Sequence, residues 1–150
     1  MNFLDTLLSN SIFTSAVAGW FVAQVVKTII HLILTREFVA ERLVGSGGMP
    51  SSHSATVCAL TTACFMKLGP GSPEFAIAVM LSIIVMHDAM GVRRETGIQA
   101  KVLNDMIEFF EDMGSDMPPQ DKLKEFVGHT PIQVLIGGLL GIAIAVILNI

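Results

Sequence analysis

Long apolar runs, interrupted by very few charges, constrain the fold of this chain more than any other feature. Only 15% of the 150 residues are charged, and the mean hydropathy is +0.67, whereas soluble domains carry about 25% charged residues. A helix that crosses a bilayer needs about 20 mostly apolar residues. The sequence therefore predicts an all-α membrane protein that forms a single integral membrane domain over residues 1–150, rather than a soluble domain.

Four apolar segments, at 12–34, 53–66, 75–90 and 131–150, account for most of the predicted helices. The second and third are short, and we expect them to be partly sheltered by their neighbours. Between the third and fourth, Ile98, Val102, Met106 and Phe109 recur at helical spacing. This pattern is typical of an amphipathic helix on the membrane or on the bundle. The predicted architecture is a multi-pass bundle of about four spanning or partly spanning helices plus one interfacial helix.

The loops carry most of the charge. Residues 111–121 are acidic and contain a Pro-Pro pair, which predicts a mobile loop. In a four-span arrangement one face has Lys67 as its cation, and the opposite face has the others: Arg36, Arg42, Arg93, Arg94, Lys101, Lys122 and Lys124. The positive-inside rule then places the cationic loops in the cytoplasm and both termini outside.

Several classes of function are disfavoured. The net charge of −4, with no Lys/Arg-rich run, argues against binding to nucleic acid. Cys58 and Cys64 lie in one apolar segment without metal-ligand spacing, and we interpret them as small packing residues. No metal site and no cofactor are predicted. The N-terminus lacks the positive region of a secretory signal, so we expect the first apolar segment to remain in the protein.

Two polar residues lie inside the first apolar segment. Lys27 is about two turns from the loop end of this segment, and His31 follows one turn later on the same face. An ionisable residue within a span indicates a functional site by default. The alternatives are a lysine that snorkels to the interface and a histidine that is only packed.

The segment from Gly47 to Ala55, Gly-Gly-Met-Pro-Ser-Ser-His-Ser-Ala, is the sharpest local feature. Glycine permits unusual backbone angles, proline suits the first turn of a helix, and serine caps it. Such a helix N-terminus attracts an anion, and His53 could deliver a proton to a leaving group there. The plain alternative is an ordinary Gly/Pro/Ser loop with a capping histidine.

Further polar residues flank the third and fourth segments. Asp88 closes the third, with Arg93 and Arg94 following, and His129 precedes the fourth. Arginine suits phosphate because its planar fork makes paired hydrogen bonds; the alternatives are membrane-edge cations and an interfacial cap. In the four-span arrangement all these positions map near one membrane face, which predicts an anion site with acid, base or nucleophile capacity: Lys27, Arg36, His53, Asp88, Arg93, Arg94 and His129.

Nearly the whole chain resembles the divergent branch of the type 2 phosphatidic acid phosphatase superfamily, which is related to acid phosphatases and vanadium-dependent haloperoxidases. The matching stretches are 48–55, 88–94 and 128–131. By this resemblance His129 is the nucleophile and His53 protonates the leaving alkoxide. Lys27 and Arg36 would hold phosphate, although their spacing is two residues longer than in the superfamily. Pro50, Ser51 and His53 match the second motif, with Ser52 in place of its glycine, so Ser51 and Ser52 are expected beside the phosphate.

The chain departs from the superfamily pattern at two positions. Gln133 stands where an aspartate orients the nucleophilic histidine, and Leu123 stands where an arginine is expected. Gln133 can orient an imidazole but cannot supply charge. We expect Asp88 to supply that charge from the neighbouring segment, and Arg93 or Arg94 to replace the missing arginine.

Three readings follow. The leading one is a metal-independent lipid phosphate phosphatase that forms a phosphohistidine, with a phosphate-bearing membrane lipid as substrate and homo-oligomers possible. The second is a phospholipid or polyprenyl-phosphate carrier on the same scaffold, and the third is a structural membrane subunit.

Overall fold

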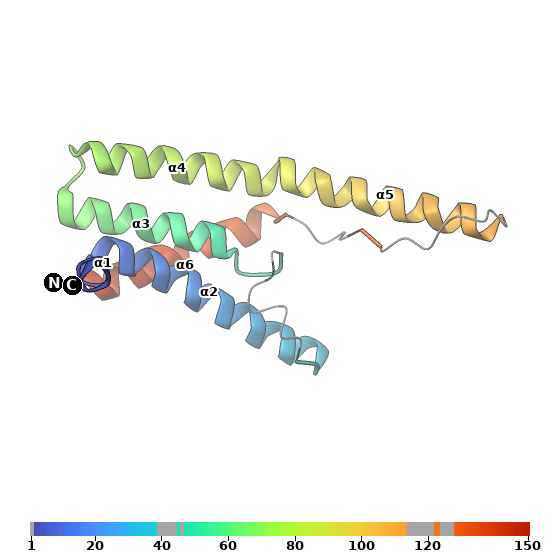
Figure 1. Cartoon of the computed structure of the whole chain (residues 1–150), viewed down its shortest axis with the longest axis horizontal. Helices are drawn as coiled ribbons and strands as arrows, with labels where there is room; N and C mark the ends of the chain where they lie inside the picture. The colour runs from blue at the N-terminus through green and yellow to red at the C-terminus, as the bar shows by residue number, and fades with distance from the viewer. Residues whose placement is uncertain (1, 39–44, 46, 114–121, 124–127) are drawn as a thin grey trace.

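The computed structural model describes residues 2–38, 45, 47–113, 122–123 and 128–150, and in these ranges the regular elements are all helices. They are, in chain order, α1 (Phe3–Leu8), α2 (Ser11–Thr35), α3 (Ser52–Leu68), α4 (Pro73–Met90), α5 (Val92–Asp112) and α6 (Pro131–Asn149) (Figure 1). The predicted all-α membrane bundle is confirmed. The short α1 was not expected from the sequence. Arg42, Lys124 and most of the expected acidic loop lie outside the described residues.

Three helical stretches are long and apolar enough to cross a bilayer: α2, the stretch Pro73–Asp112 that contains α4, and α6. Helix α3 has 17 residues, fewer than the roughly 20 that a full span needs. It is packed against α2, α4 and α6, so its less apolar surface is covered by its neighbours, as the sequence predicts for this segment.

Side-chain caps fix where these helices begin. The Asn10 side chain accepts hydrogen bonds from the backbone of the first turn of α2, and Ser72 does the same for α4 ahead of Pro73. Thr130 caps α6 in a capping box with Gln133, and Pro131 follows at the first helical position. These are the residue types that satisfy the unpaired N–H groups of a helix start.

Small residues bring α3 close to its neighbours. Ala55, Ala59 and Ala63 on α3 are fully buried. A Cβ on Gly141 of α6 would lie 2.8 Å from the carbonyl carbon of Ala55, and one on Gly19 of α2 would lie 3.0 Å from the Ala59 Cβ. Packing of this kind suits helices in lipid, where close backbone approach replaces hydrophobic burial.

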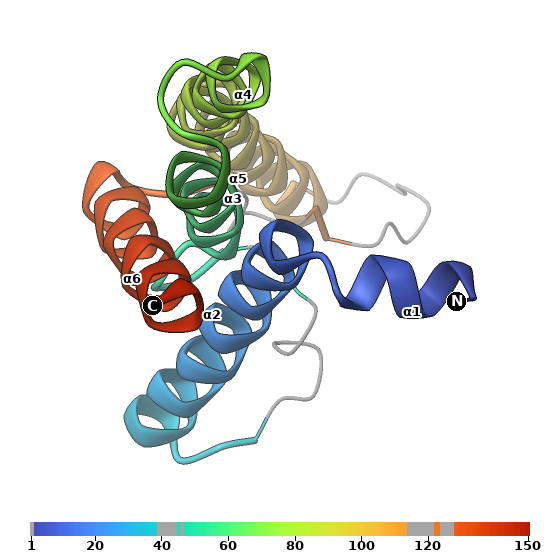
Figure 2. The same cartoon turned by 90° about the vertical axis from the view of Figure 1, so that its left-hand side faces the viewer.

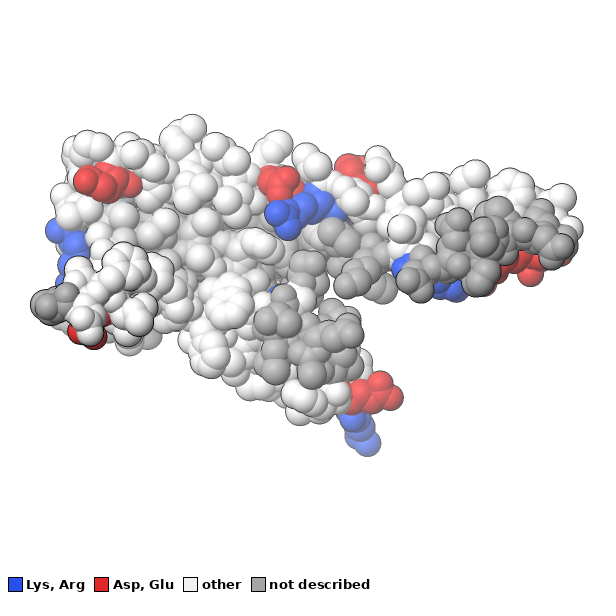
Figure 3. Space-filling view, viewed as in Figure 1, with Lys and Arg blue, Asp and Glu red and all other residues white. Residues whose placement is uncertain are grey.

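The large apolar side chains point outward instead. Ile77 and Ile84 on α4, Leu139 on α6 and Ile33 on α2 are all more than half exposed. Figure 3 shows a bundle surface largely free of charged side chains. A soluble domain seldom exposes so large an apolar surface, so this surface fits a lipid environment.

Successive helices of the bundle alternate in direction. Helices α2 and α4 run one way and α3 and α6 run back, with both termini at the same end of the bundle (Figures 1 and 2). The last turn of α4 and the first turns of α3 and α6 therefore share the opposite end. His53 and Asp88 lie in these segments and His129 directly precedes α6, whereas Lys27 lies in α2 and Arg93 and Arg94 lie in the first turn of α5.

Helix α5 continues the line of α4 beyond the bundle (Figure 1). Among the described helices α5 contacts α4 and no other. The sequence predicted that this helix lies either on the membrane or on the bundle, and the structure does not show it packed along the bundle. It begins at Val92, earlier than the apolar repeat indicates, because Arg93, Arg94 and Glu95 form a polar first turn. The Asn104 side chain donates to the Leu123 carbonyl and accepts from the Leu123 N–H, both at 3.0 Å.

Candidate functional site

Two imidazole rings face each other where α3 and α6 begin. His53 is the second residue of α3, and His129 lies two residues before α6. Their ring centroids are 6.1 Å apart and the ring planes are tilted by 60°. The backbone N–H of Ser51 donates to the Gln133 carbonyl at 3.1 Å, which ties the two helix starts together.

His129 is held by hydrogen bonds from both its backbone and its ring. It is 3% exposed, and its backbone N–H donates to the Ala89 carbonyl of α4 at 2.9 Å. Its ring Nδ1 lies 3.3 Å from the Gln133 Oε1. That same oxygen accepts the Thr130 backbone N–H at 3.0 Å. Because a backbone N–H can only donate, the shared atom is an acceptor, and His129 must carry its proton on Nδ1. The Nε2 lone pair is then available to an electrophile.

A glycine lets the chain enter α6 against the α4–α5 junction. Gly128 has φ +95°, and a Cβ there would lie 2.6 Å from the Arg94 Cα and 2.7 Å from the Arg93 carbonyl carbon. A side chain would therefore suffer both backbone strain and a clash with main-chain atoms. This close approach places Arg93 near the histidines.

Arg93 and Asp88 form an ion pair at that junction, with the Arg93 Nε 2.6 Å from the Asp88 Oδ2 and the two side chains 46% and 39% exposed. The positive charge of Arg93 acts on both imidazoles, whereas the carboxylate of Asp88 acts on His53. The sequence led us to expect Asp88 as a charge partner for His129. In the structure Asp88 pairs with Arg93 instead, and the His129 Nδ1 is bonded to Gln133.

Lys27 supplies a buried cation. It is 2% exposed, and its Nζ donates to the Gln24 Oε1 at 2.6 Å and to the Gly45 carbonyl at 3.1 Å. Its charge acts on both histidine rings. A snorkelling lysine would extend its ammonium group into water, and this one does not. Gln24 was missed by the sequence reasoning, although a glutamine one turn before an intramembrane lysine is itself an unusual polar residue in a span.

The surroundings lower the pKa of His129 below that of an ordinary histidine. Burial is the main cause, because it disfavours the imidazolium; the charges on His53, Lys27 and Arg93 act in the same direction, and the hydrogen bond to Gln133 opposes them. The ring is therefore neutral near pH 7, as a nucleophile requires.

The start of α3 offers further polar groups. Ser51 and Ser52 are buried, and the Ser51 Oγ accepts from the Ser54 backbone N–H at 3.4 Å and from the Ser54 hydroxyl at 3.0 Å. Ser51 therefore acts as the helix cap, and a cis peptide bond joins Met49 to Pro50 just before it. The Nδ1 of His53 is buried and has no hydrogen-bond partner in the described part of the chain. Helix starts carry partial positive charge, so two of them here favour an anion.

Other predicted residues lie further out. Arg36 is exposed in the left-handed cap of α2, with φ 58°, nine residues beyond Lys27 or about 13 Å along a helix axis. The Arg94 side chain is exposed, and its backbone forms the contact with Gly128. Leu123 lies beside Asn104 of α5, so the residue at the expected arginine position is three turns from Arg93.

Among the described residues no group of three His, Cys, Asp or Glu could hold a metal ion.

Comparisons with known proteins show the family of this chain. The model of the divergent PAP2 family matches residues 8–144, which include every candidate residue. The chain is 42% identical over 151 residues to the "Uncharacterized membrane protein YuiD" of Bacillus subtilis (strain 168), covering 95% of this chain and 96% of that protein. No solved structure matches the chain. From the matched extent and the identity to this relative, the chain belongs to the divergent PAP2 family.

Proposed function

We propose that this protein is a metal-independent phosphatase that hydrolyses a membrane lipid phosphate through a phosphohistidine. The observation that carries the proposal is the pairing of His129, with its proton on Nδ1, and His53 at 6.1 Å between centroids, under the charges of Lys27 and Arg93. Nucleophile, acid and cations are the parts that phosphoryl transfer needs.

In the first step the His129 Nε2 attacks phosphorus. The N–P bond forms as the bond from phosphorus to the lipid oxygen breaks, and His53 in its protonated form gives that oxygen a proton. Lys27 and Arg93 stabilise the negative charge on the transferring group. A phosphate dianion between the rings also favours a protonated His53, because it offsets the repulsion from the two cations.

In the second step water attacks the phosphohistidine. His53, now neutral, takes a proton from the water as the new O–P bond forms and the N–P bond breaks. Inorganic phosphate leaves and His129 returns to its neutral form. Gln133 keeps the His129 ring oriented in both steps, since its Oε1 accepts a hydrogen bond from the Nδ1–H group throughout.

The position of the site supports a lipid substrate. It lies at the end of an apolar bundle with outward-facing isoleucine and leucine side chains, so the phosphate of a lipid could reach it while the chains stay in the bilayer. Arg36, Arg93, Arg94 and Lys101 lie toward this end, and Lys67 ends α3 at the other. By the positive-inside rule we assign the site to the cytoplasmic face.

Phosphate release from phosphatidate by the purified protein in mixed micelles tests this function. We expect His129→Ala to abolish release, by about a thousandfold or more, and His53→Ala to lower it by about a hundredfold or more. His87→Gln is a matched control, because His87 is an exposed histidine on α4 whose ring takes no part in the site. Unchanged release by His129→Ala would reject the mechanism.

A second candidate function is a carrier that binds a phospholipid or polyprenyl phosphate without cleaving it. The neutral Gln133 favours it, because an amide cannot stabilise the imidazolium that forms during attack as a carboxylate would. A carrier would bind the lipid phosphate tightly, show no release, and keep its affinity in His129→Ala.

A further inference from the structure

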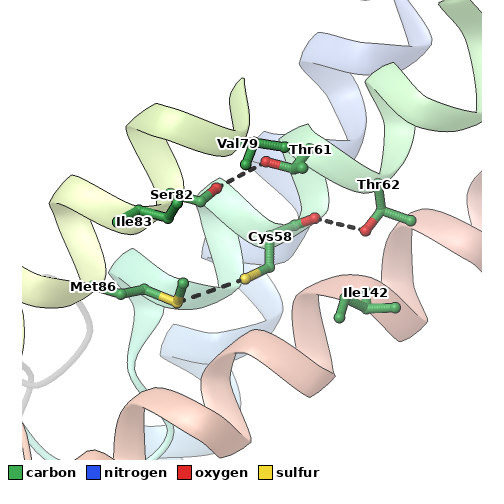
Figure 4. A pocket seen from close by; sticks show the side chains of 8 residues that line it. All are labelled: Cys58, Thr61, Thr62, Val79, Ser82, Ile83, Met86 and Ile142. Atoms are coloured by element: carbon green, nitrogen blue, oxygen red, sulfur yellow. Dashed lines mark hydrogen bonds between the residues drawn. The ribbon is translucent and has the colours of Figure 1, made fainter. Parts of the chain in front are cut away.

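An apolar groove lies on the outer side of the bundle, separate from the residues of the candidate site. Its volume is about 190 Å³, and it lies between α3, α4 and α6 (Figure 4). Cys58, Thr61 and Thr62 line it from α3, with Val79, Ser82, Ile83 and Met86 from α4 and Ile142 from α6. Ile83 and Ile142 are 52% and 42% exposed, so the groove opens to the surface that faces lipid.

The hydroxyl groups in the wall have partners in the protein. Thr61 donates to the Val57 carbonyl at 2.8 Å. It also lies 2.8 Å from the Ser82 hydroxyl, and Thr62 donates to the Cys58 carbonyl at 2.8 Å (Figure 4). Ser82 in turn donates to the Val57 carbonyl at 3.1 Å. With these hydroxyls turned toward helix backbones, the groove offers methyl and methylene groups to its occupant, which suits a hydrocarbon rather than a polar molecule.

The groove lies between helices that also surround the histidine pair: His53 is on α3, His129 directly precedes α6, and the His129 backbone N–H donates to Ala89 of α4. Cys58 is five residues beyond His53 on α3, about 7 Å along the axis, and Thr62 is about 13 Å beyond it. On α4, Met86 precedes Asp88 by two residues, and the Met86 Sδ lies 3.9 Å from the Cys58 Sγ. The near end of the groove is therefore one to two helical turns from the imidazoles, toward the interior of the bilayer.

The geometry points to a subsite in which this groove holds a hydrocarbon chain of the lipid whose phosphate lies between His53 and His129. The assignment rests on the proposed function for the identity of the phosphate site. A phosphate held at the helix starts fixes the position of the head group, and the groove then fixes the direction of the chain. The substrate class is accordingly a phosphate ester with a long alkyl or acyl chain, and a chain-free phosphate ester gains nothing from the groove.

The test fills the groove without touching the histidines. Val79→Phe adds a ring to the wall of the groove, and Met80→Phe, at the next residue of α4, adds the same ring at an exposed position that does not line it. The KM for long-chain phosphatidate and the kcat/KM for glycerol 3-phosphate are measured for both variants and the parent. We expect Val79→Phe to raise the KM for long-chain phosphatidate about tenfold and to leave the kcat/KM for glycerol 3-phosphate unchanged. Met80→Phe should change neither of these two constants.

Equal effects of Val79→Phe on the two substrates, or none on phosphatidate, would overturn the subsite. Direct binding separates this result from failure of the proposed function. If the parent protein releases no phosphate, the Kd for long-chain phosphatidate decides: about tenfold weaker binding by Val79→Phe than by Met80→Phe supports the groove. Equal affinities of the two variants, or no binding by the parent, overturn it.

Discussion

The tautomer and orientation of the His129 ring depend on a single amide oxygen. Gln133 Oε1 accepts from the Thr130 N–H and from the imidazole Nδ1, so the position that holds aspartate elsewhere in the superfamily still fixes the tautomer. The Gln133 side chain orients the His129 ring but supplies no charge to it. The sequence indicated this role for Gln133 through the resemblance to the superfamily, in which an aspartate at this position orients the histidine. It could not show that Asp88 is engaged by Arg93, since that depends on side-chain directions across the α4–α5 junction.

The first prediction concerns the charge at position 133. Gln133→Glu keeps the reach of the side chain but adds a carboxylate, which favours the imidazolium and raises the pKa of His129. Because the pKa of His129 is lowered in the parent, we expect the proposed phosphatase activity to rise with pH below the ordinary histidine range. We expect the acidic limb of the kcat/KM profile to move to higher pH in Gln133→Glu.

Gln133→Leu, of similar size, removes the acceptor altogether. Its kcat should fall by about tenfold to a hundredfold while the Tm in detergent changes little, because the capping hydroxyl of Thr130 remains. An acidic limb at the same pH in parent and Gln133→Glu would contradict the assigned role of this residue.

The second prediction concerns Gly128. Gly128→Ala puts a methyl group against the Arg93 and Arg94 backbone at a positive φ, so either the chain before α6 shifts or the protein loses stability. We expect a loss of about 2 to 4 kcal/mol in unfolding free energy, with most of the activity lost. Gly71→Ala is the control, since a Cβ there meets nothing within 4 Å. Equal stability of the two variants would show that the close approach is unimportant.

At the scale of the helices, the separation between α3 and α6 sets the distance between the two imidazoles. Gly137 and Gly141 make that separation small, because a Cβ on Gly137 would meet the backbone of Ser51, the cap of α3, and one on Gly141 would meet the backbone of Ala55 in α3. The sequence predicted the bounds of α2, α3, α4 and α6 to within about two residues because their apolar runs end at caps and turns. It missed α1, whose six residues are too few to form a recognisable periodic pattern.

The third prediction compares two glycines of α6. Gly141→Ala forces its methyl group onto the Ala55 main chain, which cannot move without displacing α3 and His53. Gly138→Ala meets the Cys58 Sγ at 3.2 Å, a side-chain atom that can shift. We expect Gly141→Ala to cost about 1 to 3 kcal/mol of stability and to lower kcat, and Gly138→Ala to cost less on both measures. Thermal unfolding in detergent and phosphate release measure the two effects. The reverse order would contradict this packing account.

At the scale of the whole molecule, alternating helix direction gathers residues that are scattered over more than 100 positions of sequence. Lys27, His53, Arg93 and His129 lie on four different segments, yet the charges of Lys27 and Arg93 act on both imidazoles. Four alternating apolar segments were enough to predict that these residues share one end of the bundle. The ring separation and the exposed position of Arg36 could not be derived in this way, because they depend on helix tilt and on how far α2 continues beyond Lys27.

Identification of the phosphorylated residue tests the central claim most directly. The protein is mixed with phosphatidate labelled in its phosphate, quenched during the first turnovers under alkaline conditions that preserve phosphohistidine, digested, and analysed by mass spectrometry. The account predicts a phosphoryl group on the peptide that contains His129, present in His87→Gln and absent in His129→Ala. Turnover with the phosphoryl group on another residue, or turnover that persists in His129→Ala, would contradict it.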